Sequence, residues 1–245
     1  MQRVYYDFHL HSCLSPCGDN EMTPYNIANM AKFLGFDMIA LTDHNSCLNC
    51  EAAVKAGKEA GITVIPGMEL CTMEEAHVVC LFPTVDDAMR FHQYVQENTL
   101  HIPNQPEIFG QQLMMDHTDQ ILGEEPCLLI NSANIGIDSV VELTARYHGA
   151  AFPAHIDRDS YSILNSLGVV PDEANFSAVE ISYDGDIALL ERTNPEIMDK
   201  VLLQNSDAHY LEHMQDPFPW LELEEASPEC LIAVLQGKAV AQWEV

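Results

Sequence analysis

Short apolar runs alternate along the chain with longer segments whose apolar residues recur at helical spacing. The predicted strands cover residues 4–8, 38–41, 62–65, 78–82, 150–154, 178–182 and 201–204. The predicted helices cover residues 24–34, 51–60, 86–96 and 138–147, and a last helix starts at Ser227-Pro228 and ends near Gly237. Strands that alternate with helices favour a parallel sheet with right-handed crossovers, so we expect an α/β fold.

Polar residues stand at the end of almost every one of these apolar runs. The segments are Asp7-Phe8-His9-Leu10-His11-Ser12, Thr42-Asp43-His44, Gly67-Met68-Glu69, Glu75-Ala76-His77, Pro153-Ala154-His155 and Ser206-Asp207-Ala208-His209. His9 and His11 are two residues apart on a strand, so both side chains point to one face and can reach one metal ion. An open sheet binds its ligand at one switch point, whereas candidates at six strand ends favour a closed or nearly closed barrel.

The residue types in these segments are those that bind transition metals. Six histidines and three acids are involved: His9, His11, His44, His77, His155, His209, Asp43, Glu69 and Asp207. A catalytic zinc usually takes three protein ligands, so this set suits two or three clustered ions. Imidazole and carboxylate accept Zn, Mn or Fe, and clustered ions of this kind favour hydrolysis of a phosphate ester.

The overall charge limits the partners that we expect. The formal net charge is −28, with 10 Lys and Arg against 38 Asp and Glu. Proteins that bind long nucleic acid or anionic membranes carry the opposite balance, so we expect neither partner, and instead a small phosphorylated substrate. The N-terminus lacks the apolar core of a signal peptide, and no apolar run approaches the roughly 18 residues that span a bilayer. We therefore expect a cytoplasmic protein with mostly reduced cysteines.

The segment from about residue 97 to 137 interrupts the alternation of strands and helices. It contains Pro103, Pro106 and the Gly123–Pro126 turn signal, and it lacks a clear period. The length of 245 residues, 47% of them hydrophobic, is enough for one barrel that uses the whole chain. We expect a single domain over residues 1–245, with an insertion or a lid at about 97–137.

Taken together, the motifs resemble those of the PHP (polymerase and histidinol phosphatase) superfamily of metal-dependent phosphoesterases. The resemblance runs from Asp7 to His209 and keeps the order of the family's motifs. It implies a distorted (β/α)7 barrel with three divalent metal ions at the C-terminal ends of the strands. It also implies hydrolysis of a phosphate monoester, such as a nucleotide or a molecule like histidinol phosphate, by a metal-bound hydroxide.

The resemblance also implies which residues hold the ions. The implied ligands are His9, His11, Glu69 and Asp207 for the first ion, Glu69, His77 and His155 for the second, and His44 and His209 for the third. Asp43 would orient His44 or touch the water network, and His44 or His209 could help to protonate the leaving group.

The loop after His11 departs from the family pattern, in which many members carry Ser-Asp-Gly with the Asp as a ligand of the third ion. Here the sequence is Ser15-Pro16-Cys17-Gly18-Asp19, and Pro16 stands where the ligand would be. We expect the thiolate of Cys17 to complete the third site, with Asp19 as the alternative. A thiolate favours Zn or Fe over Mn or Mg. Cys47 and Cys50 follow His44 closely, so a structural zinc or a redox pair that also uses Cys13 and Cys17 stays open.

The substrate and the reaction leave further alternatives. Arg158 is the one basic residue close to a motif, and its planar guanidinium suits a phosphate, although a surface ion pair is equally compatible. A PHP module that binds metals without catalysis and a phosphodiesterase that acts on short nucleotides both fit the motifs. Amidohydrolase barrels also begin with His-x-His, but they commonly use a bridging Lys where this chain has Glu69.

Overall fold

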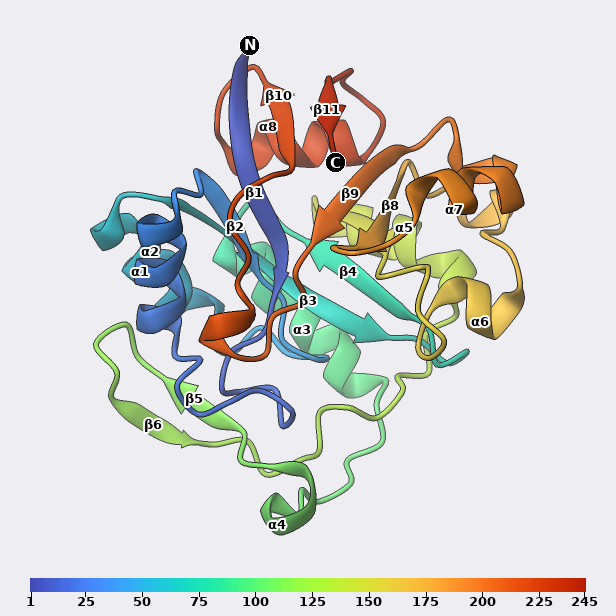
Figure 1. Cartoon of the computed structure of the whole chain (residues 1–245). Coiled ribbons are helices and arrows are strands. Elements are labelled where there is room, and N and C mark those ends of the chain that lie inside the picture. Colours follow the sequence, from blue (N-terminus) through green and yellow to red (C-terminus); the bar gives the residue numbers. More distant parts are fainter.

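A computed structural model describes all residues from 1 to 245. Seven strands surround a central axis in the order β1-β2-β3-β4-β7-β8-β9 (Figure 1). Their bounds are Gln2–Leu10 (β1), Met38–Leu41 (β2), Thr63–Cys71 (β3), His77–Leu81 (β4), Ala150–Pro153 (β7), Ala178–Ser182 (β8) and Val201–Asn205 (β9). These correspond to the seven predicted strands, and the expected distorted (β/α)7 barrel is confirmed.

The barrel is distorted because two of its seams are not continuous ladders. Strands β1, β2, β3, β4 and β7 belong to one hydrogen-bonded sheet, whereas β8 and β9 form a separate parallel pair. Next to β7, the backbone N–H of Ile156 donates to the carbonyl of Glu180 on β8 at 2.9 Å. Next to β9, the backbone N–H of Phe8 on β1 donates to the side chain of Asn205 at 2.7 Å, and Leu10 pairs with Ala208. The sheet therefore curls until its two ends meet.

One strand runs against the expected direction. β1, β2 and β3 are parallel, but β4 is antiparallel to both β3 and β7. Only residues 72–76 connect β3 to β4, and a parallel pair needs a crossover of about a dozen residues or more. The expectation of an all-parallel sheet is therefore wrong at this strand. As a result, the first residue of β4 lies at the same rim as the last residues of its neighbours.

Helices cover the outside of the barrel, and the last of them covers one of its ends. They are α1 (Pro24–Leu34), α2 (Cys50–Ala60), α3 (Val85–Glu97), α5 (Ile137–Arg146), α6 (Ile163–Leu167), α7 (Ile187–Thr193) and α8 (Pro228–Leu235). The predicted limits of α1 hold, because the Thr23 hydroxyl accepts from the backbone N–H of Asn26 and Gly35 ends the helix at φ 98°. No helix is long and apolar enough to cross a membrane.

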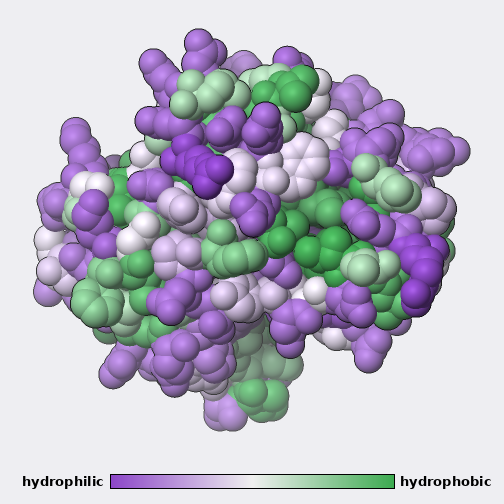
Figure 2. Space-filling view, turned by 45° about the horizontal axis from the view of Figure 1, so that its top comes forward, coloured by the Kyte–Doolittle hydropathy of each residue, from purple (hydrophilic) through white to green (hydrophobic).

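The barrel core is closed at the end away from the functional residues. Tyr6 and Phe8 stack inside it with ring centroids 4.3 Å apart. Leu231 and Leu235 of α8 pack in the same cluster, and β10 (Trp220–Leu223) pairs antiparallel with β1, with β11 (Trp243–Glu244) beside it. These elements occupy the upper end of Figure 1, and hydrophilic residues cover much of the face that Figure 2 shows. The opposite rim remains accessible.

The segment expected to be an insertion or lid contains α4 (Pro106–Phe109) and a hairpin of β5 (Leu113–Met115) and β6 (Ile121–Glu124), at the lower end of Figure 1. It packs on the loop that follows β1, where the backbone N–H of Leu113 donates to the carbonyl of Cys13 at 2.8 Å. Gly110 has φ 101°, and a β-carbon there would lie 2.1 Å from the carbonyl oxygen of Pro16. The segment thus supports the loop that carries Cys17, and its role as a lid stays a prediction.

Candidate metal centre

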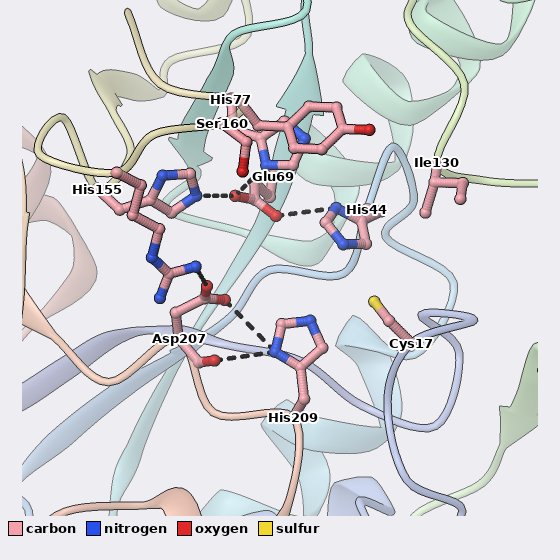
Figure 3. A pocket seen from close by; sticks show the side chains of 11 residues that line it. Cys17, His44, Glu69, His77, Ile130, His155, Ser160, Asp207 and His209 are labelled. Atoms are coloured by element: carbon pink, nitrogen blue, oxygen red, sulfur yellow. Dashed lines mark hydrogen bonds and ion pairs between the residues drawn. The ribbon is translucent and has the colours of Figure 1, made fainter. Parts of the chain in front are cut away.

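Seven of the nine predicted ligand residues line one cavity at the open rim of the barrel, and His9 and His11 lie next to it in contact with Glu69 and Asp207. Glu69 lies within β3, and His9 precedes the last residue of β1, where a bulge between Asp7 and Leu10 alters the register with β2. The others are His11 after β1, Cys17, His44 after β2, His77 at the start of β4, His155 after β7, and Asp207 and His209 after β9. Figure 3 shows seven of these side chains around the cavity. The rim brings together residues that are up to 200 positions apart in the chain.

Glu69 is the centre of this arrangement. Its Oε1 atom lies 2.8 Å from Nδ1 of His77 and 3.2 Å from Nε2 of both His9 and His155. Its Oε2 atom lies 2.8 Å from Nδ1 of His44 and 3.3 Å from Nε2 of His11. One carboxylate, only 1% exposed, therefore faces five imidazole nitrogens. Oε1 contacts three of them and Oε2 contacts the other two.

A second carboxylate, that of Asp207, contacts the two histidines at the end of β1. Oδ1 of Asp207 lies 2.9 Å from Nε2 of His11 and 3.3 Å from Nε2 of His9. The two Nε2 atoms lie 3.1 Å from each other. Ligands about 2.1 Å from a tetrahedral metal are about 3.4 Å apart, so these separations fit ligands of a shared cation. Oδ1 of Asp207 and Oε2 of Glu69 are buried and have no hydrogen-bond partner, which also fits a cation.

Two further groups of possible ligand atoms share residues with the first. In each group the atoms lie within 4.8 Å of one another, and the groups are His11, His44 and His209, and His44, Glu69 and His77. Cys17 lines the cavity, and its thiol points toward His44 and His209 in Figure 3. Asp19 does not line the cavity, because its Oδ1 accepts from the backbone N–H of Glu21 at 2.8 Å. Of the two alternatives for the third site, only Cys17 reaches the cavity wall.

The charges of the site perturb the protonation of its members. Burial opposes ionisation of Glu69, but the imidazoles of His77, His9 and His44 hold the pKa of this carboxyl well below its ordinary range. Burial likewise disfavours protonation of His11, but its contacts with Asp207 and Glu69 raise its pKa to about 9. Burial and the nearby charge of His11 lower the pKa of His209 to about 3. His209 is therefore a neutral imidazole at pH 7, with a lone pair available for a cation.

Glu180 is a functional candidate that the sequence motifs did not reveal. Its two carboxylate oxygens each lie 3.0 Å from Nδ1 of His9. They also accept from the backbone N–H of His155 at 3.0 Å and from the side-chain amide of Asn205 at 2.8 Å. Ser15 plays a similar part for His11, whose Nδ1 lies 2.9 Å from the hydroxyl. Such partners fix which imidazole nitrogen is free to bind a metal. The one available signal was an acid in the middle of a predicted strand, which an ordinary buried acid would also give.

Asp43 lies beneath the rim and does not line the cavity. Its carboxylate accepts from the backbone N–H and the hydroxyl of Ser12 and from the hydroxyl of Ser15, each at 2.7 Å. These bonds join the loop after β1 to the loop that carries His44. The geometry gives Asp43 a positioning role, and its direct part in catalysis stays a prediction.

The cavity above the cluster has a volume of about 250 Å³. Arg158 is the one Lys or Arg among its lining residues, and its guanidinium forms an ion pair with Oδ2 of Asp207. Ile130, Ser160 and Tyr161 complete the wall, and none of these three was predicted. A cation beside a group of ligands suits an anion that binds the metals and the guanidinium together.

The cysteines do not gather into a site of their own. The thiols of Cys47 and Cys50 donate to the carbonyl of Gly67 at 3.2 and 3.3 Å within a buried apolar cluster. Cys13 belongs to a different cluster with Leu113 and Met115. None of the possible metal-binding groups contains these thiols, so the structure does not form a four-cysteine site.

Several residues at the site adopt left-handed backbone conformations. The φ angles are 47° for Asn45, 29° for His155, 53° for Tyr161 and 50° for Asp207. Each such residue costs on the order of 1–3 kcal/mol and persists where the surrounding structure holds it in place. Asn45 is held in place by its own side chain, because its amide donates to the carbonyls of Leu129 and Asn131 at 2.7 Å.

Comparison with known proteins identifies the family to which this arrangement belongs. Residues 7–208 match the PHP domain, a region that contains every predicted ligand but His209. The chain belongs to the PHP domain family. The resemblance inferred from the motifs is thereby confirmed.

Three relatives illustrate the range of the family. This PHP domain is 35% identical to a 5'-3' exoribonuclease of Haemophilus influenzae over 79 residues. The aligned segment covers 31% of this chain and 28% of that protein. Its fold is similar to the lesion-specific endonuclease Q of Pyrococcus furiosus (TM-score 0.70, 16% identity, 99% of this chain, 58% of that one). It is also similar to a presumed metal-dependent phosphoesterase of Bifidobacterium adolescentis (TM-score 0.61, 16% identity, 83% and 87% covered).

The chain spans only part of two of these relatives, 28% of the exoribonuclease in sequence and 58% of endonuclease Q in structure. At 16% identity the structural likeness shows a shared fold. Endonuclease Q has also been solved with a 27-mer duplex whose abasic lesion lies at the active site. This runs partly against the expectation that long nucleic acid is excluded as a partner.

Proposed function

We propose that this PHP domain hydrolyses the phosphate monoester of a small molecule, with nucleotides as the favoured substrates, and that it uses three divalent cations. The observation that carries the proposal is the single carboxylate of Glu69 opposite five imidazole nitrogens at the floor of an accessible cavity. Neutral imidazoles and carboxylates at these separations suit Zn, Mn or Fe.

Each group of ligands has a proposed ion. His9, His11, Glu69 and Asp207 would hold the first, Glu69 with His77 and His155 the second, and His44 and His209 with Cys17 the third. Clustered divalent ions supply a water of lowered pKa and positive charge near the phosphoryl oxygens. The pKa of His209, lowered to about 3, makes this residue better suited to holding a cation than to protonating the leaving group.

The residues of the chain itself orient the substrate. Arg158 would bind a phosphoryl oxygen through one arm of its guanidinium while the other arm keeps its contact with Asp207. Asp43 would hold the loops of His11 and His44 in register through its three hydrogen bonds. Glu180 would keep the proton of His9 on Nδ1, so that Nε2 remains free for a cation.

Two features favour a small substrate. The cavity of about 250 Å³ lies just below the usual range for ligand sites of about 300–1,000 Å³. The net charge of −28 disfavours a long polyanion. A second candidate, cleavage of a phosphodiester in a short nucleic acid, is supported by the nuclease relatives.

The test is hydrolysis by protein that has been stripped of metal and reloaded with Mn²⁺ or Zn²⁺. We expect phosphate release from an aryl phosphomonoester and from nucleoside monophosphates, and little cleavage of a bis-aryl phosphodiester or a short RNA. Glu69→Gln should abolish turnover, whereas Glu142→Gln, the same change at an exposed position, should not. Faster cleavage of the diester or the RNA would favour the second candidate, and no turnover with any metal would contradict both.

A further inference from the structure

A second cavity adjoins the metal centre and shares two wall residues with it, Ile130 and Tyr161. Its volume is about 230 Å³, and its wall combines the hydrophobic residues Cys71, Leu100 and Ile102 with the polar residues Glu75, Asn131 and Ser132. In Figure 3, Ile130 reaches toward the site on the side of His44. A molecule held at the metal centre therefore meets an apolar surface on this side.

Tyr161 is held in a way that suits stacking. One face of its ring lies on the imidazole of His77, with centroids 4.8 Å apart and an angle of 22° between the planes. The residue is still 51% exposed, so much of the ring remains available to a ligand. Its backbone has φ 53°, which is unfavourable for a residue with a β-carbon, and its carbonyl accepts from the backbone N–H of His77 at 2.8 Å. The backbone of Tyr161 is thus joined to the start of β4, and its ring packs on His77.

The same loop carries the proposed phosphate-binding residue. Arg158 and Tyr161 are three positions apart between β7 and α6. The hydroxyl of Ser162 donates to the carbonyl of Arg158 at 2.6 Å and accepts from the backbone N–H of Asn165 at the start of α6. A rigid loop therefore places a cation and an aromatic face at a fixed spacing beside the metal centre.

The opposite side of Arg158 is less suitable for an apolar group. A cavity of about 510 Å³ there is lined mainly by polar residues, including Asp157 and Asp184, and its aromatic residue is Tyr183. Three carboxylates line this cavity, those of Asp157, Asp184 and Asp207, and they would repel a second phosphate and offer a flat ring little apolar contact. The cavity beside Ile130 and Tyr161 has one carboxylate, that of Glu75, and five hydrophobic residues among eight, so it is the better site for a planar group.

We propose that Tyr161 and Ile130 bind the base of a nucleotide whose phosphate lies at the metal centre. Tyr161 stacks on the base, and Ile130 with Leu100 and Ile102 forms the apolar wall beside it. The inference deepens the proposed function, because it names the part of the substrate that sets specificity.

Adenosine 5'-monophosphate and ribose 5-phosphate test this directly, because both lose phosphate from a primary 5'-oxygen and differ in the base. For Mn²⁺-loaded protein we expect kcat/KM to be at least about tenfold higher for the nucleotide. Tyr161→Ala should bring this ratio close to one, because KM should rise much more for the nucleotide than for ribose 5-phosphate. Tyr161→Phe should keep the ratio, and so should Tyr183→Ala, the matched control in the polar cavity.

Three results would overturn the proposal. They are a wild-type ratio near one, a ratio that Tyr183→Ala removes and Tyr161→Ala preserves, and an equal loss of both activities in Tyr161→Ala. If neither substrate is hydrolysed, the proposed function fails, and equilibrium binding of the two compounds to the Mn²⁺-loaded protein decides the base site separately. Tighter binding of the nucleotide that depends on Tyr161 would support the site, and equal affinities would refute it.

Discussion

Replacement of Glu180 by Gln tests whether a residue outside the predicted ligand set controls the metal centre. The carboxylate is 1% exposed and faces three donors: Nδ1 of His9, the backbone N–H of His155 and the side-chain amide of Asn205. A glutamine offers one oxygen and one NH₂ group in place of two oxygens, so at least one donor loses its acceptor. Asn205 cannot rotate its amide to compensate, because its oxygen accepts from the backbone N–H of Phe8 at 2.7 Å.

His9 can respond to this change in one of two ways. It can keep its proton on Nδ1 and face an NH₂ group, which loses a charge-assisted hydrogen bond of about 1.5–3 kcal/mol. Alternatively it can move the proton to Nε2, the atom that faces Glu69 and Asp207, and Nε2 is then blocked for a metal. At about 1.4 kcal/mol per factor of ten, either response should weaken metal binding roughly 10- to 100-fold.

The affinity is measured by competition with a chromophoric chelator at pH 7.5, and the His9 tautomer by ¹⁵N NMR of the imidazoles. Glu142→Gln is the matched control, because Glu142 is exposed on α5 and pairs only with Arg146. A folded Glu180→Gln protein whose metal affinity stays within about twofold of the wild type would refute the reasoning.

Four further outcomes are expected. Cys17→Ser should remove the thiolate-to-metal charge-transfer absorption of Co²⁺-loaded protein and lower the number of metal ions per chain. The control Cys127→Ser should change neither. An unaltered spectrum of Cys17→Ser would show that Cys17 does not belong to the third site. Arg158→Ala should raise KM for a phosphomonoester at least about tenfold with a smaller effect on kcat, and an unchanged KM would exclude a phosphate contact. Burial lowers the pKa of His92 to about 4, so below pH 6.5 the unfolded chain binds a proton that the folded protein excludes. The free energy of unfolding of the metal-free protein should therefore fall by up to about 3 kcal/mol between pH 6.5 and 4. Urea titrations should show a smaller fall for His92→Gln. Chelation should lower the melting temperature by roughly 15–30 °C relative to protein with each of the three metals at 100 times its dissociation constant, because each ion adds about 2.7 kcal/mol of stability. Equal melting temperatures would argue against a metal site in the folded state.

The barrel and the identity of its rim could be predicted from sequence because both depend on short-range patterns. Seven apolar runs gave the seven strands, and His9 with His11 showed by their spacing alone that both point to one face. Thr23 and Gly35 likewise set the ends of α1 through local backbone requirements. These signals lie within a few residues, where strand and helix periodicity determine side-chain direction.

The support around the site could not be predicted because it depends on contacts between distant segments. Glu180 reaches His9 across 171 positions, and nothing near it in the sequence distinguishes it from an ordinary buried acid. Ile130 and Tyr161 become wall residues only through the packing of two loops, and no motif marks them. Asp43 is the opposite case, because a motif marks it but did not reveal its contacts. Its three hydrogen bonds to Ser12 and Ser15 join two loops.

The reversed strand β4 explains how one carboxylate can contact so many imidazoles. Because β3 and β4 are antiparallel, Glu69 pairs with Val79, and His77 lies two residues along β4 on the same face. Diagonal neighbours of this kind are within reach of long side chains, which accounts for the 2.8 Å contact between His77 and Glu69. In a parallel arrangement the first residue of β4 would lie at the far end of the barrel, beside α8. The five-residue connection between the strands, too short for a crossover, is therefore the feature of the sequence that places His77 at the metal centre.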